Sequence, residues 1–349
     1  AIGSLIKNDK KFSELENRNL KTNVKFSIKG FLNGSFQEDY EKYINDQFPL
    51  RDKWISLKSI SEYALGKVEN NGIIYGSNGE LFEKFDSLNE ERLKNNIEAI
   101  NNFSQNYYDK VSLMIIPNSY EIYKENLPMN SPIIMQREII NEIYNFLQFT
   151  NNLDVMKDLI DNKNKYIYYK TDHHWTTYGA YLAYCNFINS INENKIDLEG
   201  LQEVELPNFY GTYYSKAKSF NIKPDTMVYY NFNNLTMEIV GDKIYDSIYD
   251  YSKVNLRDKY SLFLYGNNPL TIIKNKDIKN NKKILVIKDS FGNSLVPFLT
   301  QNYEEIHVID LRYFTSRLSS YLEKNYFENI LIIYNFINLA TVNNILRLK

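Results

Sequence analysis

Three apolar runs near the end of the chain alternate with helical segments, and this pattern restricts the fold more than any other feature. The runs "KKILVIKDS" (282–290), "EEIHVID" (304–310) and "ENILIIYNF" (328–336) predict strands, with helices predicted over 293–302 and 313–325. Strands that are apolar at consecutive positions are buried on both faces, which is typical of a parallel sheet between two layers of helices. Because βαβ connections are right-handed, we expect a mostly parallel, doubly wound α/β sheet with helices on both faces.

The rest of the chain gives weaker signals, and we expect one domain over residues 1–349. A helical pattern over residues 35–65 is interrupted by Pro49, and "GIIYGSNGELFE" (72–83) predicts a hairpin. Helices are expected over 88–108, 134–150 and 175–191, and strands over 111–117, 153–155 and 165–170. Residues 195–280 alternate weakly and are rich in Asn, Tyr and Asp, so we expect an insertion with some β-structure near a substrate groove.

Charge and cysteine content exclude several classes of protein. The formal net charge is -2 and no basic stripe is present, so we expect no nucleic-acid partner. The one cysteine, Cys185, excludes an internal disulfide and a cysteine-based zinc cluster, and its place in a predicted helix indicates a buried, inert thiol. No apolar run approaches the roughly 18 residues that cross a bilayer. The chain begins "AIGSLIKNDKKF" without Met, and we expect a mature form trimmed after a signal peptide or a membrane anchor.

The turn after the first of the three apolar runs is a candidate nucleophile site. Ligands of doubly wound sheets bind at the carboxyl ends of strands, where Asp289 and Ser290 stand in this chain. A serine in a tight strand-to-helix turn is exposed at the sheet edge, and the N–H groups of the following helix can hold a developing oxyanion. The alternative is that Asp289 and Ser290 only cap the helix, because both residue types are common at N-caps.

A serine nucleophile needs a base, and histidine is the side chain suited to this task near pH 7. Of the three histidines, His307 lies inside a predicted strand, where we expect a packing residue or a satisfied polar group. The other two are adjacent in "TDHHWTTYGAY". In an extended segment Asp172 and His174 point to the same side, so the carboxylate could orient the His174 ring and leave Nε2 for the serine proton. His173 would then point the other way and support the turn or contact substrate, and Trp175 would line the site or pack beneath it.

Two other interpretations of this motif stay open. Two histidines and an aspartate can ligate zinc, but adjacent histidines do not easily reach one ion and no further ligand stands at a recognised spacing. We therefore expect no metal. Alternatively, the segment is a structural turn whose polar groups satisfy one another.

Taken together, the motifs resemble a known family. "DHHWT" followed by a helix, with "IKDSFGNSLVPFL" far downstream, resembles the bacterial DHHW protein family, which is similar to the SGNH-hydrolase-like domains of periplasmic alginate O-acetyltransferases. "ENRNL", "GSFQEDYEKYINDQFPLRDKW" and "EEIHVIDLRY" fit the same family, so the resemblance spans nearly the whole chain. It implies an SGNH-hydrolase-like α/β fold with Ser290 as nucleophile, His174 as base and Asp172 as the orienting acid.

The order of these motifs matches the alginate enzymes, because aspartate and histidine precede the serine. Two features depart from SGNH esterases: "KDS" stands where Gly-Asp-Ser is usual, and a clean Gly-x-Asn-Asp block is missing. The second oxyanion donor is therefore unassigned, with Asn118, Asn293 and Asn335 as candidates. Arg312 and Tyr313 follow a predicted strand, and we expect them, with Asn293, to line the same sheet edge or to pack against it.

The resemblance implies an extracellular polysaccharide O-acetyltransferase that needs no cofactor and forms an acetyl ester on Ser290. It further implies a membrane-bound O-acyltransferase as acetyl donor, and a secreted polysaccharide as acceptor, either cellulose or another glycan. Association with the cell surface through an N-terminal signal or anchor, as in biofilm exopolysaccharide systems, is part of the same expectation. Two alternatives are a carbohydrate acetyl esterase with the same triad and a noncatalytic polysaccharide-binding protein, since the triad does not choose between water and a sugar hydroxyl.

Overall fold

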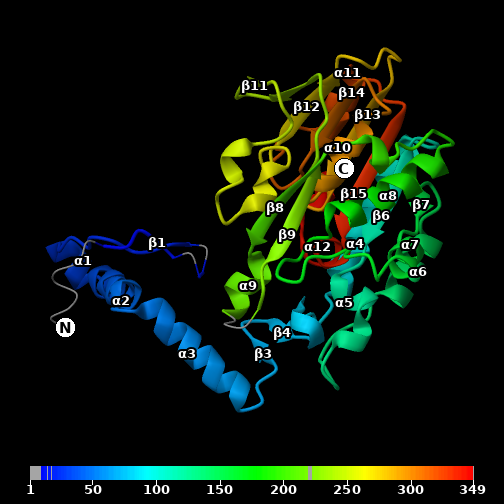
Figure 1. The fold of residues 1–349 in the computed structure, drawn as a ribbon. Helices are drawn as coiled ribbons and strands as arrows, with labels where there is room; N and C mark the ends of the chain where they lie inside the picture. The colour runs from blue at the N-terminus through cyan, green and yellow to red at the C-terminus, as the bar shows by residue number, and fades with distance from the viewer. Residues whose placement is uncertain (1–8, 14, 17, 219–221, 349) are drawn as a thin grey trace.

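The computed structural model describes residues 9–13, 15–16, 18–218 and 222–348. Within these residues, eight strands form a central sheet in the order β11-β10-β12-β14-β13-β15-β6-β7 (Figure 1). They are β6 (Val111–Ile116), β7 (Asn151–Leu153), β10 (Leu235–Ile239), β11 (Ile244–Tyr245), β12 (Leu270–Asn275), β13 (Lys283–Lys288), β14 (Glu305–Ile309) and β15 (Asn329–Asn335). The five strands from β14 to β7 pair in parallel, whereas β12, β10 and β11 extend the sheet antiparallel. The predicted mostly parallel sheet is confirmed, with an antiparallel edge that was not expected.

Burial of the central strands explains why their sequences are apolar at consecutive positions. Every residue of β6 is buried, and so is every residue of β13 and β15 except the first. Neighbouring residues of a strand face opposite sides of a sheet, so both faces are covered. The three C-terminal strands predicted from the sequence are confirmed as β13, β14 and β15.

Two groups of helices pack beside this sheet. The helices of the main body are α4 (Glu90–Asn106), α5 (Ser119–Ile122), α6 (Arg137–Phe146), α7 (Met156–Asp161), α8 (Thr177–Ser190), α9 (Thr212–Ala217), α10 (Gly292–Leu299), α11 (Leu318–Lys324) and α12 (Phe336–Thr341). In one group α8 packs against α10 and α7, and in the other α4 packs against α12. The helix predicted over 134–150 is shorter, because Leu147 turns into an extended conformation and is buried. Thr176 caps α8 with its side chain, which accepts from the Gly179 N–H.

The N-terminal helices extend away from the sheet, as Figure 1 shows in blue. They are α1 (Ile28–Leu32), α2 (Ser35–Gln47) and α3 (Arg51–Ala64), beside a small sheet of β1 (Phe12–Ser13) and β2 (Arg18–Asn19). The predicted break at Pro49 is confirmed, because α2 ends before it and α3 begins after it. Within the described part of the chain, no helix combines the length and the apolar character needed to cross a membrane. The first eight residues, on which the expected trimmed start depends, lie outside the described residues.

A three-stranded antiparallel sheet connects these helices to the main body. It consists of β3 (Glu69–Asn70), β4 (Ile73–Tyr75) and β5 (Leu81–Glu83). The hairpin predicted over 72–83 is confirmed as the β4–β5 pair. Its turn is the 3₁₀ helix η2 (Ser77–Gly79), in which Asn78 and Gly79 adopt positive φ angles of 59° and 75°. Asparagine and glycine tolerate this left-handed conformation, which explains the turn.

Residues 195–280 contain the expected β-structure. An antiparallel pair, β8 (Glu203–Phe209) and β9 (Asp225–Tyr230), lies outside the central sheet, whereas β10, β11 and β12 belong to it. The 3₁₀ helices of this segment are η4 (Leu198–Gly200), η5 (Tyr251–Lys253) and η6 (Lys259–Leu262), with η3 (Lys124–Asn126) and η7 (Asn344–Leu348) elsewhere. The segment thus contributes part of the central sheet as well as a separate antiparallel pair of strands.

The predicted strand over residues 165–170 is wrong. Only an isolated bridge joins Tyr168 to Trp175, and the backbone N–H groups of Lys170 and Thr171 donate to the Asp225 carboxylate. At Lys170 and Thr171 a side chain thus takes the place of a partner strand. The strand predicted over 153–155 is correct only for its first residue, since β7 ends at Leu153.

Candidate active site

Ser290 lies in the turn between β13 and α10, at the carboxyl edge of the parallel sheet. Asp289 holds this turn: its carboxylate accepts hydrogen bonds from the backbone N–H groups of Phe291 at 2.9 Å and Asn335 at 2.8 Å. Burial raises the pKa of Asp289 above its usual value. Gly292 permits the close start of α10, because a Cβ there would lie 2.8 Å from Lys288 Cβ. The serine is therefore presented on a rigid turn, only 8% exposed.

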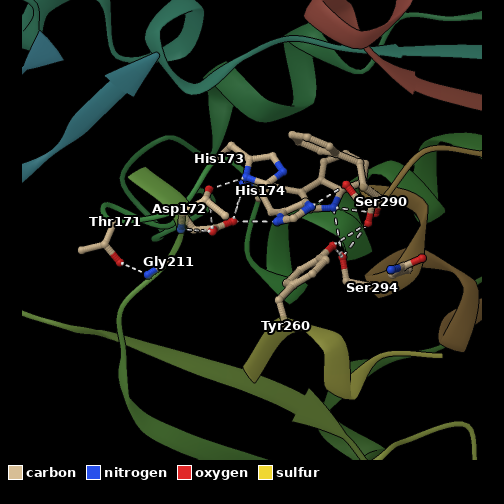
Figure 2. Close-up of polar contacts among 12 residues, drawn as sticks. Thr171, Asp172, His173, His174, Gly211, Tyr260, Ser290 and Ser294 are labelled. Atoms are coloured by element: carbon tan, nitrogen blue, oxygen red, sulfur yellow. Dashed lines mark hydrogen bonds and ion pairs between the residues drawn. The ribbon is translucent and has the colours of Figure 1, made fainter. Parts of the chain in front are cut away.

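The imidazole of His174 lies between Ser290 and Asp172 (Figure 2). Its Nε2 is 2.8 Å from Ser290 Oγ, and its Nδ1 is 2.6 Å from Asp172 Oδ1. All three side chains are buried. Two segments far apart in the sequence thus bring a hydroxyl, an imidazole and a carboxylate into one hydrogen-bond chain. Such a chain can move a proton off the hydroxyl while the carboxylate stabilises the imidazolium.

Asp172 is held by a turn and by the start of α9. Its Oδ1 also accepts from the backbone N–H of His174 at 3.0 Å, and its Oδ2 accepts from the backbone N and Oγ1 of Thr212 at 2.7 and 3.1 Å. Burial opposes ionisation, but the two imidazoles and the Thr212 N–H hold the pKa of Asp172 well below its usual range. Gly211 lets α9 approach, since a Cβ there would lie 2.2 Å from Asp172 Cβ.

The expected extended geometry of this segment is wrong. Residues 171–174 form bends, and Asp172 reaches His174 because its carboxylate folds back onto the His174 N–H, as short polar side chains do in turns. His173 does not point the other way either. Its ring lies on the His174 ring, with centroids 3.7 Å apart, and its Nδ1 is 2.7 Å from Thr212 Oγ1. Burial, followed by the neighbouring His174, lowers the pKa of His173 to about 4.

The part of the chain that contains this geometry matches a known protein family. The model of the DHHW protein family matches residues 66–309. The chain belongs to the DHHW protein family. The matched range contains Asp172, His174 and Ser290, so the residues joined by the hydrogen-bond chain lie within the part shared with the family.

Two solved structures and a curated protein are also similar to this chain. A DHHW family protein of Eubacterium siraeum is 26% identical with a TM-score of 0.70, over 80% of this chain and 96% of that one. PatB1 of Bacillus cereus shares the fold, at 22% identity and a TM-score of 0.64, over 79% of this chain and 99% of that one. The probable alginate O-acetylase AlgJ of Pseudomonas syringae pv. tomato is 23% identical over 182 residues, 49% of this chain and 46% of that protein. This DHHW protein therefore spans less than half the length of the curated relatives it matches.

Trp175 of the DHHW motif packs beneath the site. The side chain is fully buried, and its Nε1 donates to Phe291 O at 3.1 Å and lies 3.0 Å from Ser294 Oγ. Both partners belong to the turn and first helical residues after Ser290. Of the two roles expected for Trp175, the structure therefore supports packing beneath the site, where the indole ties the motif to α10.

The other predicted site residues lie further from the hydrogen-bond chain. The Oδ1 of Asn293 accepts from Lys288 Nζ at 2.5 Å, and its amide nitrogen is directed at Asn267 and the Gly266 carbonyl. Arg312 forms an ion pair with Asp310 at 2.5 Å, and Tyr313 is exposed. Within the described residues, neither Arg312 nor Tyr313 forms a hydrogen bond with Asp172, His174 or Ser290.

The remaining candidates from the sequence have structural partners. The Nδ2 of Asn335 donates to Ile116 O and Asn118 Oδ1, at 3.1 and 3.0 Å, which leaves neither Asn335 Nδ2 proton for an oxyanion. His307 is buried, bonded to Tyr321 and to Glu305 at 2.7 Å, so its expected role as a satisfied polar residue is confirmed. Cys185 is a buried free thiol inside α8, also as expected.

Three residues of the site were missed by the sequence analysis. Thr212 anchors Asp172, Tyr260 stacks on His174, and the Phe291 ring lies 5.0 Å from that of His174. Phe291 follows Ser290 directly in the sequence, so its position was a usable signal. Thr212 and Tyr260 come from residues 195–280, where no sequence pattern distinguishes them from the many other polar and aromatic residues.

A metal is a poor fit to this cluster. Asp172, His173 and His174 are the one group of three His, Cys, Asp or Glu side chains within the described residues whose ligand atoms lie close enough for an ion. The Asp172 carboxylate already bonds His174 Nδ1 and the Thr212 N–H, and His174 Nε2 already bonds Ser290 Oγ. An ion would have to break these bonds, so the donor set favours proton transfer.

Proposed function

We propose that this DHHW protein is an extracellular polysaccharide O-acetyltransferase that forms an acetyl ester on Ser290. The observation that carries the proposal is the continuous hydrogen-bond chain from Asp172 through His174 to Ser290. The similarity to a probable alginate O-acetylase supports acetyl transfer to a polysaccharide hydroxyl. We further assign the fold to the doubly wound, SGNH-hydrolase-like group, which agrees with the parallel strand order β14-β13-β15-β6, where later strands lie on both sides of β13.

In the first half-reaction, Ser290 Oγ attacks the carbonyl carbon of an acetyl ester. His174 Nε2 takes the hydroxyl proton, and Asp172 stabilises the imidazolium through Nδ1. The tetrahedral intermediate then collapses, the bond to the leaving oxygen breaks, and His174 returns the proton to that oxygen. An acetyl ester of Ser290 remains, and one difficult transfer is divided into two easier ones.

In the second half-reaction, a sugar hydroxyl attacks the acetyl carbon of that ester. His174 Nε2 accepts the sugar proton and then gives it to Ser290 Oγ as the ester bond breaks. The acetyl group leaves on the sugar and the enzyme is regenerated. Exclusion of water from the buried serine favours transfer over hydrolysis, since water is the competing acceptor.

One oxyanion donor is the backbone N–H of Ser290. Within the described residues it donates no hydrogen bond, whereas the N–H groups of Phe291, Gly292 and Asn293 already donate to Asp289 or Ser290. A preorganised donor beside the nucleophile stabilises the negative charge of the tetrahedral intermediate.

The proposal includes partners and location. A membrane-bound O-acyltransferase supplies acetyl from across the membrane, the acceptor is cellulose or another secreted glycan, and the protein acts at the cell surface. These points rest on the family resemblance, and each can be tested apart from the chemistry of the triad.

The test is acetyl transfer by the purified protein. The protein is incubated with 4-nitrophenyl acetate and a panel of soluble glycan oligosaccharides, and the oligosaccharides are examined for acetyl groups by mass spectrometry. Acetylation of at least one glycan by the wild type, and not by Ser290→Ala, is the expected result. Release of acetate at a rate unaffected by any glycan would indicate an esterase instead, and the absence of both reactions with retained glycan binding would indicate a binding protein.

A further inference from the structure

Tyr260 lies face to face with the proposed base. It belongs to η6 in residues 195–280, is 5% exposed, and its ring is stacked on His174 with centroids 3.7 Å apart and planes 9° from parallel (Figure 2). Its hydroxyl donates to the backbone carbonyl of Ser290 at 3.0 Å and pairs with Ser294 Oγ at 3.1 Å. One side chain therefore contacts both the base and the nucleophile.

The other face of His174 is covered as well. The His173 ring lies at the same centroid distance of 3.7 Å, tilted by 38°. Two rings cannot share one face of an imidazole at this distance, so Tyr260 and His173 lie on opposite faces. Both ring nitrogens of His174 are also engaged, with Asp172 and Ser290. The imidazole is thus held on both faces and at both nitrogens.

Charge gives this stacking a role in the reaction. When His174 takes the serine proton it becomes a cation, and the face of a phenol ring carries negative charge that attracts cations. His173 does not readily take up a proton itself, since burial and the neighbouring imidazole lower its pKa to about 4. The carboxylate of Asp172 stabilises the imidazolium in the plane of the ring. The Tyr260 ring, only 9° from parallel, adds stabilisation from one face.

We propose that Tyr260 is a positioning residue whose ring stabilises the imidazolium form of His174 while its hydroxyl fixes the carbonyl of Ser290. This inference rests on the proposed function, because it requires His174 to act as the base. It also gives residues 195–280 a part in the chemistry, since the Tyr260 side chain completes the surroundings of the two reacting groups.

The two parts of the side chain can be separated by substitution. Tyr260→Phe keeps the ring and loses the hydroxyl, so we expect acylation within about 10-fold of wild type. Tyr260→Leu also loses the ring, and acylation should fall by about a further 30-fold, the effect expected for a desolvated cation–π contact. Tyr249→Leu is the matched control, because Tyr249 is a buried tyrosine of the same segment whose hydroxyl donates to a backbone carbonyl, that of Tyr230 at 2.7 Å.

The decisive experiment replaces Tyr260 with phenylalanine analogues of increasing ring fluorination. Fluorine withdraws negative charge from the ring face and changes the size of the ring little, so these proteins keep the packing of Tyr260→Phe. The burst of 4-nitrophenolate from 4-nitrophenyl acetate gives the acylation rate, and melting temperatures confirm folding. We expect the rate to fall with each added fluorine, and Tyr249→Leu to acylate near the wild-type rate.

The outcomes separate this inference from the proposed function. A wild type that is acylated on Ser290, together with equal rates across the fluorinated series, would overturn the role of Tyr260 alone. Equal slowing by Tyr249→Leu and Tyr260→Leu would also overturn it, since general loss of packing would then explain both. A wild type that is never acylated on Ser290 would overturn the proposed function and this inference with it.

Discussion

The Nε2 atom of His174 lies 2.8 Å from the Oγ atom of Ser290, although 116 residues separate the two in the chain. Trp175, the next residue after His174, bonds the carbonyl of Phe291, the next residue after Ser290, at 3.1 Å. The two motifs are therefore joined both by the contact between His174 and Ser290 and by the indole of Trp175. The predictions below test these two contacts and the groups that hold them.

The two adjacent histidines should differ in effect. His174→Ala removes the imidazole that bonds Ser290 Oγ, so acylation by 4-nitrophenyl acetate should fall by about 10⁴-fold. His173→Ala leaves the hydrogen-bond chain intact and removes one stacked ring, so acylation should fall much less, by about 10-fold. Burst kinetics of the two variants measure this difference. A His174→Ala protein with wild-type activity would contradict the assignment.

Close packing at Gly211 should couple the position of Asp172 to stability. A Cβ at this position would lie 2.2 Å from Asp172 Cβ, so Gly211→Ala must displace the carboxylate or the start of α9. We expect a loss of about 1–3 kcal/mol in unfolding free energy together with slower acylation. Gly200→Ala is the control, because a Cβ added there would meet no heavy atom within 4 Å. Urea unfolding and burst kinetics of both variants decide the matter, and equal behaviour of the two would refute the coupling.

The Trp175 indole should stabilise the turn that carries Ser290. Trp175→Phe keeps most of the buried ring but removes the N–H donor to Phe291 O and Ser294 Oγ, which should cost about 1–3 kcal/mol. The control is Trp54→Phe on α3, where the side chain is 56% exposed and we expect little change. Urea midpoints of the two variants provide the comparison, and an unaffected Trp175→Phe protein would show that the indole bond is dispensable.

Acid should destabilise the protein partly through His173. The pKa of this residue is lowered to about 4 in the folded protein, from 6.5, chiefly by burial. Between pH 6.5 and 4, His173 is protonated in the unfolded chain but neutral in the folded protein. The free energy of unfolding therefore decreases as the pH falls from 6.5 to 4, by at most about 3 kcal/mol. Asp172 adds a further loss below its ordinary pKa of 3.8, because its own pKa is lowered.

Replacement of His173 isolates its share of this pH dependence. His173→Asn removes the proton-binding group and retains a polar side chain beside Thr212, so its melting temperature should vary less between pH 6.5 and 4.5 than that of wild type. The loss below pH 3.8 should remain in both proteins. If the melting temperatures of the wild type and of His173→Asn decrease equally between pH 6.5 and 4.5, the lowered pKa of His173 is contradicted.

The sequence was most informative where burial is continuous and least informative where side chains replace regular backbone pairing. The strands β13, β14 and β15 were predicted because their residues are apolar on both faces. The segment 165–170 was predicted as a strand, but its end is held by the Asp225 carboxylate, which accepts from the N–H groups of Lys170 and the following Thr171. A local pattern of residues does not contain that contact.

Prediction of the candidate site from the sequence was limited in the same way. Asp172, His174 and Ser290 were identified because proton transfer from a serine requires these residue types. The extended geometry assumed for residues 172–174 was wrong, because Asp172 also bonds the His174 N–H and forms a turn. Thr212 and Tyr260 reach the site only through the fold of residues 195–280, a segment whose own pattern is weak.

The most direct test of the account is the covalent state of Ser290 during turnover. The wild-type protein is mixed with 4-nitrophenyl acetate, quenched in acid within the burst, digested and mapped by mass spectrometry, with Ser290→Ala treated in parallel. We predict one acetyl ester, on the peptide that contains Ser290, which disappears when an acceptor glycan is added before the quench. Acetyl release by a wild type that never carries the ester on Ser290, or an equally active Ser290→Ala protein, would contradict it.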